Sequence, residues 1–184
     1  MIRLCPGAYE DAAALAQVHV ATWRDAYAGI LPTDMLVRMS VDRQMRYWRT
    51  ALMRRRANEA ITVATVDETL VGFGTCGPAR GRDAVRTGEV QMLYVDNDYQ
   101  ERGLGRALLR ALFAALRRHR MDRAVIWVVA QNPARFFYEA MGGTMHAERS
   151  ERLWNADIAT LSYVWEDLDA TIQALDNRIA RVNR

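Results

Sequence analysis

Two closely spaced glycines, a carboxylate and a phenol are the residues of this 184-residue chain that could do chemistry together. Gly103 and Gly105 lie in the segment QERGLG (residues 100–105), which follows an apolar run and opens an amphipathic stretch. The first amides of a helix have no internal partner, its dipole favours an anion, and glycine lets a phosphate approach the backbone. The segment therefore predicts a pyrophosphate cradle at a helix N-terminus.

Other nucleotide-binding motifs do not fit this segment. A dinucleotide fingerprint needs a third glycine, whereas position 108 is Leu, and a Walker-type loop needs a Gly-Lys-Ser/Thr ending. The pattern here is Gln-x-x-Gly-x-Gly directly after Leu93-Tyr94-Val95. It resembles the acetyl-CoA signature of GNAT-family N-acetyltransferases; a plain strand–helix connection is the alternative.

The resemblance implies acetyl-CoA as the cofactor and no metal. The pyrophosphate fits the amides of residues 101–106, and Arg102 and Arg106 add positive charge. The resemblance assigns the pantetheine arm to the strand edge at residues 93–95, splayed from residues 124–129, and the thioester oxygen to the Leu93 amide. The predicted cofactor-binding residues are Leu93, Tyr94, Val95, Glu101, Arg102, Gly103, Leu104, Gly105, Arg106, Gln131, Asn132 and Arg135.

Transfer of an acetyl group to an amine needs a base and benefits from an acid. An alkylammonium has a pKa of about 10 and must lose a proton, while the departing thiolate gains one. Glu89, on the strand that carries Leu93, matches the general base of some GNAT subfamilies; an ordinary exposed carboxylate is the alternative. Tyr138, in Phe137-Tyr138-Glu139-x-x-Gly142, matches the family's tyrosine acid; a packed aromatic ring is the alternative.

Two positions depart from the family's pattern. An asparagine usually precedes the tyrosine by seven residues, which is Gln131 here, with Asn132 one residue late. Either residue is the predicted cofactor ligand. The family's Gly-Phe pair is replaced by Gly142-Gly143, and we expect the missing ring to leave a gap in the packing.

Residues 19–32 are predicted to face the acceptor. Trp23, Tyr27, Ile30 and Leu31 recur at helical spacing in this segment. It resembles the Trp-Arg-x-Ala-Tyr-x-Gly stretch of many GNAT sequences, in which the first two helices line the acceptor site. These four residues are therefore predicted to contact the substrate, with a purely core role as the alternative for Trp23.

Periodicity and turn residues predict the element order β-α-α-β-β-β-α-β-α-β, which is that of the GNAT fold. The expected strands are residues 2–4, 60–66, 70–76, 89–95, 124–129 and 154–165, and the expected helices are residues 11–20, 34–56 (one or two helices), 103–120 and 132–141. The continuous apolar run at 124–129 predicts a strand buried on both faces. The fold class is α/β (α+β): a mixed, mostly antiparallel sheet of about six to seven strands flanked by helices.

Composition is that of an ordinary globular protein, with 51% hydrophobic and 26% charged residues. No apolar run reaches the roughly 18 residues of a membrane span, and the N-terminus lacks a signal-peptide pattern, so we expect a cytoplasmic protein without a membrane partner. Cys5 and Cys76 lack metal-ligand spacing. The net charge of +3, with arginine as the basic residue throughout, suits coenzyme A but does not argue for nucleic acid.

Residues 168–184 are predicted to form an amphipathic helix after the predicted catalytic domain, residues 1–167. Leu168, Ile172, Leu175, Ile179 and Val182 are spaced as a heptad seam. The seam either packs on its own domain or docks on a second subunit, so a homodimer is an open expectation.

The leading hypothesis is an acetyl-CoA-dependent N-acetyltransferase that transfers its acetyl group to a primary amine in a ternary complex. The acceptor is expected to be a small molecule, because no docking extension is evident. Alternatives are a non-catalytic acyl-CoA sensor or interaction module, acetylation of a peptide or protein amine, and an aminoacyl-RNA acceptor.

Overall fold

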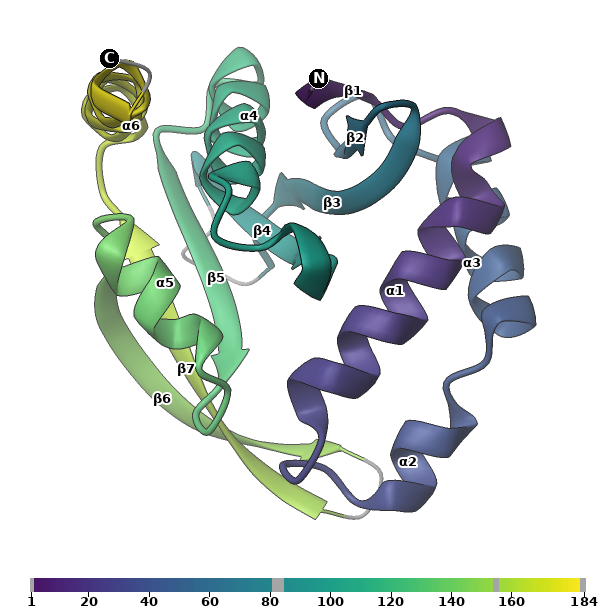
Figure 1. The fold of residues 1–184 in the computed structure, drawn as a ribbon. Helices are drawn as coiled ribbons and strands as arrows, with labels where there is room; N and C mark the ends of the chain where they lie inside the picture. Colours follow the sequence, from purple (N-terminus) through teal and green to yellow (C-terminus); the bar gives the residue numbers. More distant parts are fainter. Residues whose placement is uncertain (1, 81–84, 154–155, 183–184) are drawn as a thin grey trace. The chain divides into compact units, whose positions relative to one another are not determined.

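The computed structural model describes residues 2–80, 85–153 and 156–182 and divides the chain into two compact units. The first unit comprises Met1–Thr75 and Met92–Leu112, and the second comprises Cys76–Gln91 and Phe113–Arg184. The strands hydrogen-bond in the order β1-β2-β3-β4-β5-β7-β6, which confirms the expected mixed sheet (Figure 1). None of the helices in the described ranges is long and apolar enough to cross a membrane.

The helices are α1 (Ala12–Tyr27), α2 (Thr33–Arg38), α3 (Val41–Met53), α4 (Leu104–Arg118), α5 (Ala134–Ala140) and α6 (Leu168–Val182). The strands are β1 (Ile2–Pro6), β2 (Ala60–Val66), β3 (Thr69–Pro78), β4 (Thr87–Val95), β5 (Arg123–Val129), β6 (Thr144–Leu153) and β7 (Ala156–Trp165). Short 3₁₀ turns lie at Tyr9–Asp11 and Asn97–Tyr99. The predicted hairpin is confirmed, because β2 and β3 are joined by Asp67 and Glu68, both at the positive φ of a tight hairpin turn.

The core of the first unit has a helical layer on each side of its strands. On one side α1 and α3 run next to each other (Figure 1), and Leu15, Trp48 and Phe73 are fully buried in their cluster. On the other side Leu104 and Leu108 of α4 pack in a second cluster. Apolar side chains on both faces of the strands therefore hold this unit together.

One polar side chain lies inside the aromatic part of this core. His19 of α1 is 5% exposed and has the rings of Trp48, Phe73 and Tyr94 at centroid distances of 5.4 to 5.7 Å. Its Nδ1 and the Nε1 of Trp48 are buried without a hydrogen-bond partner among the described residues. Burial lowers the pKa of His19 from 6.5 to about 4, because the imidazolium cannot be solvated there.

The second unit places β5 between β4 and β7, with β6 at the edge. β5 pairs in parallel with β4 from Thr87↔Arg123 to Glu89↔Val125, and antiparallel with β7 from Ala124↔Trp165 to Val129↔Thr160. Helical residues cover one face, where Phe113 and Trp165 have ring centroids 5.0 Å apart. Leu168 and Leu175 of α6 are also buried.

Strand β4 is irregular. An added Cβ at Gly88 would lie 2.5 Å from Leu116 of α4, and Leu93 also lies on the α4 side, packed against the cluster that contains Leu104 and Leu108. Successive side chains of a regular strand alternate between faces, so positions five residues apart cannot share one. The strand therefore changes its facing between these positions, and Glu89, next to Gly88, points away from α4.

Three expectations were wrong. Residues 144–153 form a strand, β6, that was not predicted, because their polar character hides an exposed edge strand. β5 is not buried on both faces: its exposure alternates, and Trp127 is among the half-buried residues. Gly143 leaves no gap, since a Cβ there would lie 2.7 Å from Cζ2 of Trp165, which fills the space.

His19 predicts a pH dependence of stability. The unfolded state binds a proton near pH 6.5 and the folded state only near 4, so the free energy of unfolding is fully retained above 6.5 and falls as the pH drops toward 4. The loss is about 3 kcal/mol. Chemical denaturation from pH 7 to 4 gives the free energy of unfolding at each pH. Its decrease with falling pH should be smaller in His19→Phe than in the wild-type protein, and unchanged in His119→Phe, whose histidine is exposed. The same decrease in all three proteins would contradict the assignment.

Candidate active site

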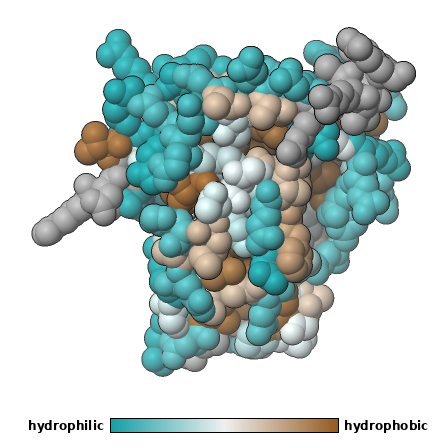
Figure 2. Space-filling model, turned by 90° about the vertical axis from the view of Figure 1, so that its left-hand side faces the viewer, coloured by the Kyte–Doolittle hydropathy of each residue, from teal (hydrophilic) through white to brown (hydrophobic). Residues whose placement is uncertain are grey.

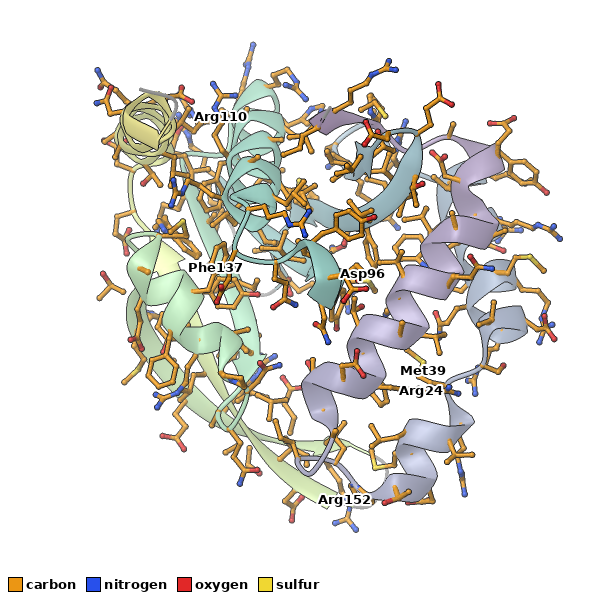
Figure 3. All side chains as sticks on the ribbon, viewed as in Figure 1. Arg24, Met39, Asp96, Arg110, Phe137 and Arg152 are labelled. Carbon is orange, nitrogen blue, oxygen red and sulfur yellow. The ribbon has the colours of Figure 1, made fainter. Side chains whose placement is uncertain are left out.

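The predicted pyrophosphate cradle lies in the first unit, between the end of β4 and the start of α4. Gln100 ties the connecting loop together, because its Nε2 donates to the Val95 carbonyl at 3.0 Å and to Oδ1 of Asn97 at 2.7 Å. Asp96 begins the turn, with Oδ1 accepting from the Asp98 amide at 3.0 Å (Figure 3). The glutamine of the motif therefore positions the loop.

The start of α4 has the features of an anion site. The Ala107 amide donates to the Gly103 carbonyl at 3.0 Å, so the amides of residues 104–106 precede the first helical hydrogen bond. Gly103 has φ +82°, and an added Cβ would find nothing within 4 Å. Nε of Arg106 is buried without a partner among the described residues. These free donors around open space fit a pyrophosphate.

The other residues of this unit that were predicted to bind the cofactor differ in their surroundings. Leu104 is 1% exposed and anchors α4 in the core. The guanidinium of Arg102 lies over the ring of Tyr99, 5.3 Å from its centroid. Glu101 is exposed and held at φ +59°, a conformation that disfavours a side chain. The loop is thus strained at a residue predicted to bind the cofactor.

The predicted acceptor-side residues lie at the end of α1 and just after it. Trp23 and Tyr27 pack with ring centroids 5.1 Å apart. Leu31 is buried, 7% exposed, and Ile30 is half-buried. The arrangement leaves both a core role and a substrate role open for Trp23.

Two side-chain links near this segment were not predicted from the sequence. Asn97 Nδ2 donates to Oδ2 of Asp25 at 2.8 Å, which joins α1 directly to the cradle loop. Arg24 donates through Nη2 to the Met39 carbonyl at 2.6 Å and so ties α1 to the turn before α3 (Figure 3). An exposed Asn and Asp 72 residues apart carry no pattern that could have revealed the first link.

Tyr138 lies in the second unit, on α5. It is 5% exposed, and its ring centroid lies 6.2 Å from that of Tyr163 and 6.4 Å from that of Trp165. Phe137, on the same helix, contacts it edge-on at 5.5 Å (Figure 3). A phenol held by three aromatic rings has a fixed orientation, which suits a proton donor.

The residues before Tyr138 have clear structural positions. Asn132 is buried, and its Oδ1 accepts from the Ala134 amide at 2.9 Å, so it caps the start of α5. Gln131 is exposed. The Arg135 guanidinium lies over the Phe136 ring, 4.2 Å from its centroid. Which of Gln131 and Asn132 contacts the cofactor stays a prediction.

Glu89 is half-buried at the last paired position between β4 and β5. Burial raises the pKa of its carboxyl; Arg80 and Arg149 oppose this rise, and Glu151 adds to it. A carboxylate whose pKa is raised toward neutrality is better suited to accept a proton from an ammonium.

A separate basic pocket of about 530 Å³ in the second unit is lined by Arg86, Arg117 and Arg120. Its charges are largely compensated. Arg86 pairs with Asp122 at 2.5 Å, and Arg117 pairs with both Asp122 and Asp169. These bonds join the ends of α4 and α6, so we interpret the cluster as a structural ion-pair network.

The site residues thus fall into a group in each unit. The first unit gathers the cradle, the end of β4 and the aromatic end of α1. The second unit holds Glu89, Tyr138 and the start of α5.

Comparison with known proteins identifies the family. The model of the acetyltransferase (GNAT) family matches residues 20–143. The N-acetyltransferase YuaI of Bacillus subtilis (strain 168) is 29% identical over 179 residues, which are 97% of this chain and 100% of that protein.

Solved structures share the fold. PaiA N-acetyltransferase of Thermoplasma acidophilum, crystallised with coenzyme A, aligns with a TM-score of 0.64 at 19% identity, over 88% of this chain and 98% of that chain. YncA of Salmonella typhimurium, an acetyltransferase crystallised with acetyl-CoA, aligns with a TM-score of 0.68 at 19% identity, over 90% and 93% of the two chains.

The chain therefore belongs to the acetyltransferase (GNAT) family. The predicted family, the GNAT fold, N-acetyltransferase activity and acetyl-CoA as the donor are confirmed.

The cradle can be tested with a matched pair of glycines. Gly103 and Gly29 both have positive φ, +82° and +75°, and open space around an added Cβ. Replacement of either by Ala should cost about 1 kcal/mol of stability, because a side chain disfavours this conformation. Only Gly103→Ala should also weaken acetyl-CoA binding, as measured by calorimetry. Equal affinities in the two variants would remove Gly103 from the cradle.

Proposed function

We propose that the protein transfers an acetyl group from acetyl-CoA to the primary amine of a small molecule by direct attack in a ternary complex. One observation carries the proposal. In the second unit, Glu89 and Tyr138 lie on opposite faces of the sheet, near the point where the β4–β5 ladder ends.

The assignment of faces follows from contacts within this unit. Gly88 faces Leu116 of α4, so its neighbour Glu89 faces the other way. Tyr138 contacts Tyr163, which pairs with Ile126 of β5 on the helical face. A base on one face and an acid on the other suit an amine that attacks the thioester from one side and a thiolate that leaves on the other.

In the proposed reaction Glu89 accepts a proton from the acceptor ammonium, directly or through water. The amine lone pair then attacks the thioester carbonyl, whose oxygen is stabilised by the Leu93 amide. The C–S bond breaks, and Tyr138 donates its proton to the departing thiolate. The nitrogen loses its second proton to water as the amide forms, and Tyr138 is reprotonated from solvent. The amides of residues 101–106 and Arg106 hold the pyrophosphate of the donor, and residues 93–95 hold its pantetheine arm.

Tyr138→Phe tests the acid. With a confirmed acceptor, kcat should fall by about 100-fold or more, with little change in the KM for acetyl-CoA. The control is Tyr163→Phe, which removes a nearby hydroxyl that donates to Glu139 at 2.6 Å. Rates are measured by thiol release; an undiminished rate in Tyr138→Phe removes it as the acid.

Glu89→Gln tests the base through the pH profile of kcat/KM. Activity should rise with pH as Glu89 loses its proton, with a midpoint above the ordinary range of a glutamate, because burial raises its pKa. The substitution should remove this rising limb of the pH profile and lower kcat/KM by about 100-fold or more. Glu151→Gln removes a charge that raises this pKa, so its limb should move to lower pH. A limb that survives Glu89→Gln would assign the base elsewhere.

The division into a catalytic domain, residues 1–167, and an added helix, as well as a homodimer, belong to the same proposal. Leu168 and Leu175 of the seam are buried, which supports packing of α6 on its own chain. Phe136 and Met145 are each 55% exposed. Figure 2 shows the side with α5 and β6, where hydrophobic residues lie among hydrophilic ones. In the proposed homodimer the second subunit binds at this surface.

The cytoplasmic location stays a prediction.

A further inference from the structure

We propose that the acceptor is a zwitterionic amine, of the amino-acid class, and that Arg149 of β6 binds its acid group while Glu89 receives its ammonium. This inference rests on the proposed acetyl transfer and adds the chemical class of the acceptor. It concerns the face of the second unit's sheet that points away from α4.

The register of the strands brings the two residues to this face. Glu89 pairs with Val125, and Trp127, two residues further along β5, shares the face of Val125. Arg149 lies with its guanidinium over the Trp127 ring, 3.6 Å from the centroid. With strands about 4.8 Å apart and a rise of about 3.3 Å per residue, the backbone positions of Glu89 and Trp127 are about 8 Å apart. One small molecule can therefore touch both side chains.

Arg149 is prepared for an anion. The indole ring fixes the plane of its guanidinium, and Glu151 pairs with its Nη2. Its side chain is 50% exposed, so a ligand can reach the guanidinium. A stacked, exposed guanidinium matches a carboxylate in planar geometry.

The charges on this face favour a zwitterion over either kind of simple ion. Glu89 and Glu151 are acidic, and Arg80 and Arg149, which act electrostatically on Glu89, are basic. A polyamine would meet the arginines, and a simple carboxylic acid has no amine to offer Glu89. A molecule with one ammonium and one acid group satisfies both signs.

The test compares amino acids with their decarboxylated amines. Phenylalanine is paired with phenethylamine, tryptophan with tryptamine, and leucine with isoamylamine, each with acetyl-CoA; thiol release gives kcat/KM and mass spectrometry identifies the acetylated amine. The wild-type protein should prefer the acid-bearing member by about 10- to 100-fold, the range for a charged hydrogen bond. Arg149→Gln should abolish this preference mainly through KM, and Arg149→Lys should restore part of it.

The matched control is Arg152→Gln. Arg152 lies on the same strand and is exposed, and its spacing of three residues from Arg149 places it on the opposite face. Its loss changes the net charge equally and should leave the preference intact. Melting curves establish that each variant is folded. The comparison in the wild-type protein needs no variant at all.

The outcomes separate this inference from the proposed function. Equal use of both members of each pair, or a preference that survives Arg149→Gln, overturns the inference and leaves acetyl transfer to amines standing. If acetyl-CoA binds but no amine of either kind is acetylated, the proposed function fails and the inference fails with it.

Discussion

The short parallel ladder between β4 and β5 is the constraint on which the candidate site depends. The ladder runs only from Thr87↔Arg123 to Glu89↔Val125, although β5 continues to Val129. A strand edge without a neighbour has free amides and carbonyls, and a peptide-like arm such as pantetheine can pair with them. The last paired residue, Glu89, is the proposed base. The proposed catalytic site therefore lies where the regular pairing of β4 with β5 ends.

Burial sets the electrostatics of both units. In the second unit it raises the pKa of Glu89, while nearby arginines oppose the rise. In the first unit it keeps His19 uncharged among aromatic rings. The surroundings of the two groups differ. Glu89 has charged neighbours and lies on a half-exposed surface of the sheet, whereas Nδ1 of His19 has no hydrogen-bond partner among the described residues and lies inside a packed core.

Sequence reasoning worked where the signal was local. The Gln-x-x-Gly-x-Gly segment, the β2–β3 hairpin and the two helices after Pro32 depend on capping, turn chemistry and helical spacing, which neighbouring residues decide. It failed where distant residues decide. β6 is polar and exposed, so only its pairing with β7 makes it a strand. Trp165, 22 residues after Gly143, fills the space that was expected to be empty.

The sequence by itself determined the family and the donor, because phosphate binding at a helix start needs only a short run of residues with fixed types and spacing. Only the tertiary structure decided on which face Glu89 lies. Its spacing of four residues would place it with Leu93, but β4 is irregular, and contacts with α4 show the reversal. The stacking of Arg149 on Trp127 likewise joins separate strands through their register. Side chains brought together across strands leave no spacing in the sequence.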